Sequence, residues 1–316
     1  MKYYTFTLLF ILILLTSCKH TDAENSPTSN PMHDLFPNAN MTWMARLDVQ
    51  MPTQDLYIHE VYNIWEFEYE GGEIAANVIF ENGLDGTATM GLMIFSDGVP
   101  IQFTVDGYNE QTMFYTLSVE GLVIIPVRFT PEFSFTTGTL DFIQFHNIYN
   151  NGVQHHSGSM RIIADVQEAL LHERYMPTFA TTPARNSLGL ASDTSYDSWL
   201  WQPDFDFSMH GTPGWTTITI GDTNSLLFEA ITGLEGIYRT TIFIDYKAIP
   251  VDDDYYTFEW ITDGENVLTF LLNIDDSLIY DKHTIFSVSF RIGGYEDVPP
   301  WVQNVAFVSR KMELVD

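Results

Sequence analysis

The sequence contains a single cysteine, Cys18, among its 316 residues. One thiol forms no intramolecular disulfide, so the fold must be stable without such a cross-link. Thiol-based catalysis, redox chemistry and cysteine-ligated zinc are excluded for the rest of the chain. Exported proteins work in oxidising compartments, where a stray thiol is a liability. The position of this cysteine near the start of the chain is therefore informative.

Basic residues are also scarce. The chain has 13 Lys and Arg against 42 Asp and Glu, which gives a net charge of −29. Such a surface repels nucleic acid and anionic lipid, so DNA, RNA and peripheral membrane binding are excluded as functions. Charged residues make up 17% of the chain, below the roughly 25% of an average soluble domain. Aromatic residues make up 15%, which is ample for more than one core, and the length predicts about two domains.

The first eighteen residues have the layout of an export signal. Lys2 precedes a nearly all-apolar run from Thr5 to Leu15, which suits a signal peptide and is too short to span a bilayer. The segment Leu15-Thr16-Ser17-Cys18 then resembles the lipobox of bacterial lipoproteins. The resemblance implies a signal peptide over residues 1–17, acylation of Cys18 by palmitate-type chains, and attachment to a bacterial membrane at the cell surface or in the periplasm. The alternative is an ordinary signal peptide, or an uncleaved anchor, that contains a cysteine.

The rest of the chain divides by composition. Residues 18–42 are polar, rich in Ser, Thr, Asn and Pro, and without periodicity, which predicts a flexible tether. Beyond them apolar and polar residues alternate, as in Trp65–Glu70 and Phe286–Ile292. Turn dipeptides such as Asp97-Gly98 separate these runs. We therefore expect an all-β fold of antiparallel sandwiches that resemble Ig-like domains, with one face of each strand in a core and the other in solvent.

An internal repeat indicates two such domains. Segments that share a glycine turn, an apolar strand residue and a proline recur 150 residues apart: Gly83–Gly86 with Gly233–Gly236, Ile94 with Ile244, and Val99–Ile101 with Ile249–Val251. A fourth match, Val78–Glu81 with Leu226–Glu229, needs a short gap. We predict tandem β-sandwich domains over 43–165 and 205–316, related by internal duplication.

Residues 166–204 are then expected to be a linker. Asp165–Glu168 resembles a helix capping box, and Ala169–Tyr175 fits a short helix. Continuation of the strand Met160–Ile163 is the alternative.

Two groups of residues are candidate metal ligands. His146, His155 and His156 lie in one hairpin-like stretch and suit zinc or copper. Adjacent residues on a strand point to opposite faces, however, so a solvated polar loop is the alternative. The run Asp252, Asp253 and Asp254 offers oxygen ligands for calcium but lacks the Asp/Asn-and-glycine spacing of a calcium loop. A charged turn is the alternative, and no other cofactor is indicated.

Tryptophans form a third group. Trp199, Trp201, Trp215 and Trp301 lie outside the clearest strand patterns. Exposed aromatic residues on a sandwich can stack on sugar rings or peptides. The alternative is that they are buried at the ends of the sandwich or between domains, because Trp is mostly buried in folded proteins.

The chain shows no nucleophile elbow, phosphate loop or HExxH motif. We therefore expect a non-catalytic, lipid-anchored extracytoplasmic protein whose tandem sandwiches bind an envelope protein or act as a spacer. A carbohydrate-binding lipoprotein is the second interpretation. A hydrolase or metal-dependent enzyme is the third.

Overall fold

The structure is a computed structural model, and it describes residues 46–58, 64–83, 86–146, 156–170, 174–183, 196–201, 217–219, 225–232, 235–252, 254–262, 266–274, 283–293, 306–309 and 312–315. The chain divides into two compact units, Met1–Asn40 and Met41–Asp316, and all described residues lie in the second. Every regular element among them is a β-strand, which confirms the all-β prediction. The described residues include no helix that is long and apolar enough to cross a membrane.

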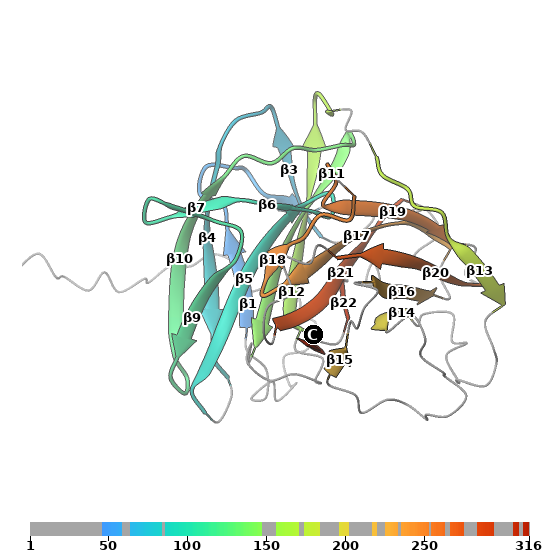
Figure 1. Cartoon of the computed structure of the whole chain (residues 1–316). Coiled ribbons are helices and arrows are strands. Elements are labelled where there is room, and N and C mark those ends of the chain that lie inside the picture. The colour runs from blue at the N-terminus through green and yellow to red at the C-terminus, as the bar shows by residue number, and fades with distance from the viewer. Residues whose placement is uncertain are drawn as a thin grey trace, which may run out of the picture. The chain divides into compact units, whose positions relative to one another are not determined.

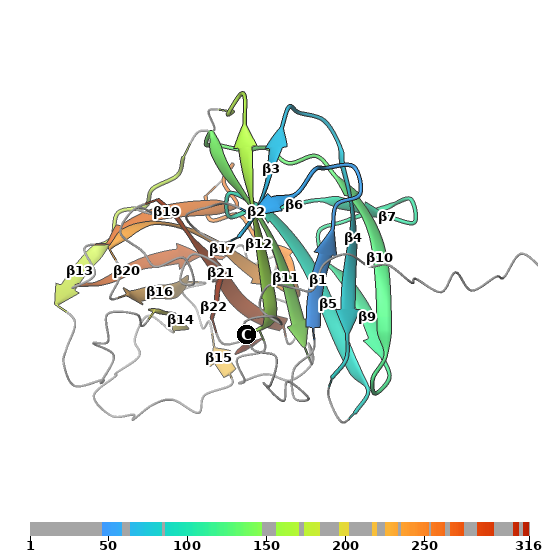
Figure 2. The same cartoon turned by 180° about the vertical axis from the view of Figure 1, so that it is seen from behind.

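Two sheets from the first half of the chain form one sandwich (Figures 1 and 2). Sheet A has the order β1-β4-β10-β7-β8, with bounds β1 Arg46–Gln50, β4 Ile74–Glu81, β10 Leu122–Phe129, β7 Phe103–Val105 and β8 Tyr108–Glu110. Sheet B has the order β2-β3-β12-β11-β5-β6, with β9 beside β5, and bounds β2 Tyr57–Ile58, β3 Trp65–Tyr69, β12 His156–Val166, β11 Thr137–His146, β5 Ala88–Ser96, β6 Val99–Ile101 and β9 Met113–Leu117.

The second half forms another pair of sheets. Sheet C has the order β13-β20-β16-β14, with bounds β13 Ala180–Pro183, β20 Asn266–Asn273, β16 Ser225–Thr232 and β14 Tyr196–Trp201. Sheet D has the order β15-β23-β21-β17-β18, with β19 beside β17 and β22 beside β21. Its bounds are β15 Thr217–Thr219, β23 Met312–Val315, β21 His283–Gly293, β17 Gly236–Ile244, β18 Lys247–Ala248, β19 Thr257–Thr262 and β22 Phe307–Val308.

The strand order is that of an Ig-like sandwich. In the first half, β1, β4, β10 and β7 take the places of strands A, B, E and D, while β12, β11 and β5 take those of G, F and C. In the second half, β14, β16 and β20 are the A, B and E strands, and β23, β21 and β17 are the G, F and C strands. Each sandwich also contains one parallel pair at the same place, β3 with β12 and β15 with β23. This shared connectivity is what a duplicated sandwich requires.

In the structure, equivalent positions of the two halves are 148 residues apart, two fewer than the sequence repeat predicted. The hairpin turn after β5 begins at Asp97 and the turn after β17 begins at Asp245, an offset of 148. Val78–Glu81 and Leu226–Glu229 have this same offset and lie in the equivalent strands β4 and β16. Ile94 therefore corresponds to Ile242, not to Ile244 as the offset of 150 predicted. The glycine motifs that suggested that offset fall partly outside the described residues.

Part of the expected linker belongs to the second sandwich. β13 pairs with β20 and β14 pairs with β16, so residues 180–183 and 196–201 are strands of sheet C. The predicted helix does not begin at the capping-box sequence, because Asp165 and Val166 are the last residues of β12 and pair with β3. Strand continuation, the alternative, therefore describes the start of this segment.

Three hydrophobic clusters order the sheets in layers. One cluster lies between sheets A and B, and a second lies between sheets C and D. The third joins the outer faces of sheets B and D. The central strands β5 and β17 are consequently buried on both faces, contrary to the expectation that each strand has one solvent face.

Candidate functional site: the buried junction between the two sandwiches

The junction has an apolar centre made of residues from both sandwiches. Its buried members are Met93, Phe95, Ile143 and Phe145 from sheet B, and Phe243, Tyr246, Phe286, Val288, Phe290, Ile292, Ala306 and Val308 from the second half. The rings of Phe95 and Phe290 have centroids 4.7 Å apart, and those of Phe145 and Phe286 are 5.5 Å apart. Aromatic pairs at such distances stabilise a packed interface beyond simple burial.

The turn between β5 and β6 lies directly on the second sandwich. At Gly98 a Cβ atom would lie 3.3 Å from the Cβ of Phe290 and 3.4 Å from the Cβ of Arg239. The backbone at Gly98 also has φ of +76°, a conformation that suits glycine. The close approach of the two sandwiches at this point therefore depends on a residue without a side chain.

Asp97, which precedes this glycine, is 2% exposed. Its Oδ2 accepts a hydrogen bond from the Ser134 backbone N–H at 2.6 Å, and its Oδ1 accepts one from the Thr139 N–H at 2.7 Å. Burial raises the pKa of Asp97 to about 6, although these hydrogen bonds and the charge of Arg239 act in the opposite direction. The carboxylate thus fixes the loop before β11 at the cost of losing its hydration.

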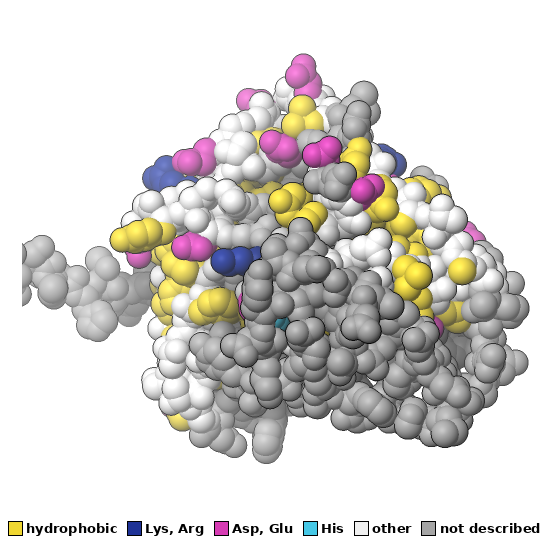
Figure 3. Space-filling model, viewed as in Figure 1, with side chains coloured by type: hydrophobic (Ala, Val, Ile, Leu, Met, Phe, Trp, Pro, Cys, Tyr) yellow, Lys and Arg dark blue, Asp and Glu magenta, His cyan; other side chains and the backbone are white. Residues whose placement is uncertain are grey.

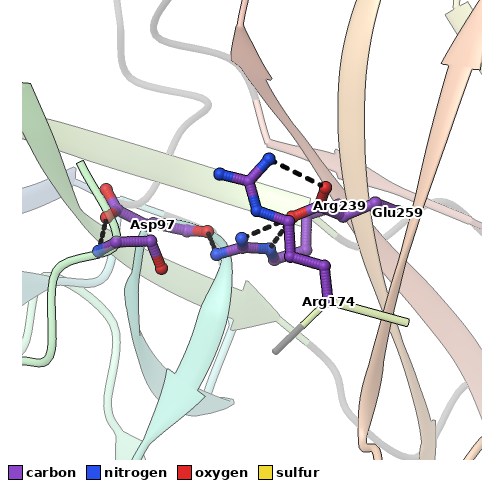
Figure 4. Close-up of polar contacts among 5 residues, drawn as sticks. Asp97, Arg174, Arg239 and Glu259 are labelled. Carbon is purple, nitrogen blue, oxygen red and sulfur yellow. Dashed lines mark hydrogen bonds and ion pairs between the residues drawn. The ribbon is translucent and has the colours of Figure 1, made fainter. Parts of the chain in front are cut away.

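Arg239 connects this turn to the second sandwich (Figure 4). Its Nη1 donates to the backbone carbonyl of Asp97 at 2.6 Å, and its Nη2 pairs with Oε1 of Glu259 at 2.5 Å. The other carboxylate oxygen of Glu259 lies 3.6 Å from Nη1 of Arg174, in the segment that joins the sandwiches. Both guanidinium groups lie within 6 Å of the ring of Phe135, at 5.2 and 5.9 Å. We call Asp97, Arg174, Arg239 and Glu259 the junction network.

A second buried ion pair lies beside the junction network. Arg161 of β12 donates to Asp141 of β11 through Nε at 2.7 Å and Nη2 at 3.1 Å, and both side chains are almost fully buried. The guanidinium carbon of Arg161 lies 5.9 Å from the ring centre of Phe290, across the junction. Burial raises the pKa of Asp141, against the opposing effect of Arg161. The first sandwich thus presents a neutralised polar patch to an aromatic ring of the second.

Asp245 repeats the role of Asp97 without the burial. It accepts a hydrogen bond from the Thr284 N–H at 2.8 Å and donates its own N–H to the Thr284 carbonyl. Asp97 makes the same two contacts with Thr139. The side chain of Asp245 is 52% exposed and also pairs with His283 at 2.6 Å. The two halves thus share this turn, and only the turn of the first half lies in the junction.

The raised pKa of Asp97 has a structural cause. A perturbed carboxyl group in a cleft can indicate catalysis, but ion-pair networks inside proteins shift pKa values in the same way. Asp97 is buried and accepts hydrogen bonds from backbone amides, and Arg239 lies close enough to act on its charge. Burial between the packed sheets therefore raises the pKa of Asp97, and the amide hydrogen bonds and Arg239 only partly offset that effect.

The residues predicted as metal ligands lie only partly within the described chain. His146 ends β11 and His156 begins β12, whereas His155 lies outside the described residues. Asp252 and Asp254 are exposed, and Asp253 also lies outside the description. No group of three or more His, Cys, Asp or Glu side chains with metal-binding geometry occurs among the described residues.

The predicted aromatic and lipidation sites are described only in part. Trp199 and Trp201 lie in β14, where they pair in register with Glu229 and Leu227 of β16. Trp215, Trp301 and Cys18 lie outside the described residues.

Sequence reasoning missed the junction network. The available signal was charge inside apolar strands: Arg239 and Glu259 interrupt hydrophobic runs, as do Asp141 and Arg161. A second signal was the run from Leu92 to Phe95, in which neighbouring residues are all apolar. Such runs are typical of strands buried on both faces.

Comparison with known proteins identifies no family for this chain. No family model matches it, and no curated protein matches it. Among solved structures, a protein of unknown function from Porphyromonas gingivalis W83 is 11% identical, with a TM-score of 0.23, over 85% of this chain and 97% of that chain. The C-terminal domain of the Streptococcus agalactiae AgI/II polypeptide BspA is 6% identical, with a TM-score of 0.20, over 86% and 100%. The chaperone–tip adhesion subunit complex of Acinetobacter baumannii Csu pili is 9% identical, with a TM-score of 0.20, over 83% and 98%. These scores are too low to support an inference about this chain.

Proposed function

We propose that this protein is a non-catalytic, lipid-anchored component of a bacterial envelope, in which two Ig-like sandwiches act as one rigid module for binding a protein partner. The observation that carries the proposal is the double burial of sheets B and D. A flexible pair of domains would leave those faces in water, whereas here the third hydrophobic cluster joins them. The module therefore presents its remaining surfaces in a constant arrangement.

Charge supports an extracytoplasmic, membrane-tethered setting. A net charge of −29 keeps the module soluble and away from the anionic lipid surface to which Cys18 would attach it. The single cysteine at a lipobox-like position supplies the attachment point. The charge and the cysteine support where the protein works, and the rigid double sandwich supports what it does there.

Replacement of Cys18 by alanine tests the anchor. We expect the Cys18→Ala protein to move from the membrane fraction to the soluble extracytoplasmic fraction, because lipidation needs the thiol. A Ser17→Ala variant is the matched control, because bacterial lipoboxes accept alanine before the cysteine, and it should stay with the membrane. Retention of Cys18→Ala in the membrane fraction would refute the anchor.

Binding of a glycan is a second candidate, and one observation favours it. Directly opposed residues of an antiparallel pair share a face of the sheet. In the strand register, Trp201 is opposite Leu227, which is opposite the 57%-exposed Leu271, and Trp199 is opposite Glu229. A glycan array separates the candidates: binding that is lost in a Trp199→Ala, Trp201→Ala variant supports the glycan function.

A further inference from the structure

One strand edge of the first sandwich is open over most of its length. β10 pairs with β4 along all eight residues, from Leu122 opposite Glu81 to Phe129 opposite Ile74. On its other side, β7 pairs with it at Arg128 only, opposite Thr104. Among the described residues, no strand covers this side of β10 from Leu122 to Val127. Both views show β10 as an outermost ribbon of the first sandwich (Figures 1 and 2).

Two observations identify the backbone groups on this edge. The N–H and C=O groups of one strand residue point to the same side, and successive residues alternate between sides. The Asn82 N–H donates to the Gly121 carbonyl in the register of β4 and β10, so odd-numbered residues of β10 bond to β4 and even-numbered ones, such as Arg128 opposite Thr104, point to the other side. Pro126 agrees with this assignment, because proline in a sheet sits where no ladder N–H is needed. Leu122 and Ile124 therefore offer both a donor and an acceptor there, and Pro126 offers its carbonyl.

The side chains beside this edge are apolar and exposed. Leu122 is 57% exposed and Ile124 is 55% exposed, both on the outer face of sheet A. Figure 3 shows hydrophobic side chains at the left-hand margin of the molecule, in the region of β7 to β10. An edge that natural selection protects from pairing usually carries charge at these positions. Here Arg128 stands at the end that β7 occupies, and Pro126 removes one donor from the open side, whereas Leu122 and Ile124 carry no charge.

The second sandwich shows that this kind of edge accepts an added strand. β20 is the counterpart of β10, and β13 pairs with it antiparallel from Ala180 opposite Thr269 to Pro183 opposite Asn266. β13 lies more than 80 residues from β20 in sequence, so it reaches that edge as a separate extended segment. It covers the first half of β20, whereas β7 reaches only the last residues of β10.

The negative charge of the chain favours a basic partner at this edge. Glu120 is exposed in the turn before β10, and Glu81, opposite Leu122 and 46% exposed, lies 4.0 Å from Arg46 on the β1 side of sheet A. A second copy of this chain would bring its own net charge of −29 to the edge, which disfavours self-pairing. A segment with lysine or arginine would be attracted instead.

We propose that the open edge of β10 binds an extended, basic segment of a partner protein as an added antiparallel strand. Backbone hydrogen bonds to Leu122 and Ile124 supply the affinity, and alternate apolar side chains of the segment cover those two residues. This inference rests on the proposed binding function and specifies its site and the chemistry of its partner.

The test uses a library of random nine-residue peptides, selected against the full chain in detergent. We expect selected peptides to alternate apolar residues with lysine or arginine. On binding, hydrogen exchange at the Leu122 and Ile124 amides should slow by about tenfold or more, because the peptide backbone accepts from both. Methylation of alternate peptide nitrogens should abolish binding, since it removes the donors of one edge.

A matched pair of variants locates the site on the protein. Ile124→Lys should lower the affinity for the selected peptides by roughly tenfold, because it removes an apolar contact and adds a positive charge that repels the basic peptide. Leu271→Lys, which changes an equally exposed residue of β20, should leave their affinity within about twofold. Failure to select any peptide, equal binding of the methylated peptide, or protection elsewhere than β10 would overturn the proposal. So would protection of these amides by self-association. None of these outcomes affects the Cys18 fractionation, so the two proposals fail separately.

Discussion

At the scale of single residues, the junction depends on charges that are costly to bury and are therefore held in place by partners. Arg239 has contacts on two sides, with the Asp97 carbonyl in the first sandwich and the Glu259 carboxylate in its own. Glu259 is 2% exposed, so its carboxylate would be a costly buried charge without a cation beside it. We expect the interaction of these residues to favour one docked arrangement more than it adds net stability.

Removal of Arg239 tests this balance. We expect Arg239→Met to lower the free energy of unfolding by about 3–5 kcal/mol, because it leaves the Glu259 carboxylate buried beside only the more distant Arg174. A second change, Glu259→Gln, should restore part of the loss, since it removes the uncompensated charge. Urea unfolding measures both variants.

The matched control is Arg128→Met, which breaks a pair with Glu73 that is exposed on both sides. That change should cost no more than about 1 kcal/mol. An Arg239→Met protein as stable as the control would show that the network contributes nothing to the junction.

Asp97 gives the protein an unusual dependence on pH. Its folded pKa of about 6 lies above the ordinary value of an aspartate, so the folded state takes up a proton before the unfolded state does. The cost of burying the carboxylate is present at pH 7 and is relieved as the pH falls through 6 towards 4. We expect Asp97 to add on the order of 2–3 kcal/mol to the free energy of unfolding over that range.

Urea unfolding at several pH values between 7 and 4 measures this effect. Asp97→Asn should remove that part of the rise, whereas Asp245→Asn, at the equivalent exposed turn, should retain it. A profile that is identical in wild-type and Asp97→Asn proteins would contradict the assignment to Asp97.

At the scale of strands, alternation in the sequence predicted where strands form but not which way they face. Phe286–Ile292 is a strand as expected, within β21. Its apolar residues, such as Phe290, pack against the other sandwich. Its small polar residues point into their own core, where Ser289 lies 2.7 Å from the hydroxyl of Thr240. The small serines leave room there for Trp260, which stacks on Tyr238 at 4.4 Å.

The direction in which the two faces of β21 point has a physical cause that the local sequence does not contain. A period-two pattern reports two different faces, and the choice between core and solvent depends on what lies beyond each face. β14 shows the same limit, because Tyr196–Trp201 lies in the expected linker and its pairing partner, β16, is about 30 residues away. The junction network was hidden for the same reason: its members come from four separate segments.

At the scale of the whole described unit, each sandwich depends on the other to cover an apolar sheet. The outer face of sheet D alone contributes Phe243, Phe286, Val288, Phe290 and Ile292 to the junction. Exposure of that many large apolar side chains would be unfavourable and would promote association. The two sandwiches should therefore unfold as one cooperative unit, although each has an Ig-like core of its own.

Two phenylalanines distinguish this coupling from independent folding. Phe290 lies in the junction, and Phe258 lies in the core between sheets C and D, and both are fully buried. Phe290→Ala and Phe258→Ala should each cost about 3–5 kcal/mol. Because Phe290 contacts Phe95 of β5, its loss should weaken hydrogen-exchange protection in β5 and β11 as well as in β21. Phe258→Ala should weaken protection in sheets C and D first, and in β5 and β11 only through the global opening of the unit. If Phe290→Ala leaves β5 and β11 as protected as in the wild-type protein, the sandwiches unfold separately and the rigid module is wrong.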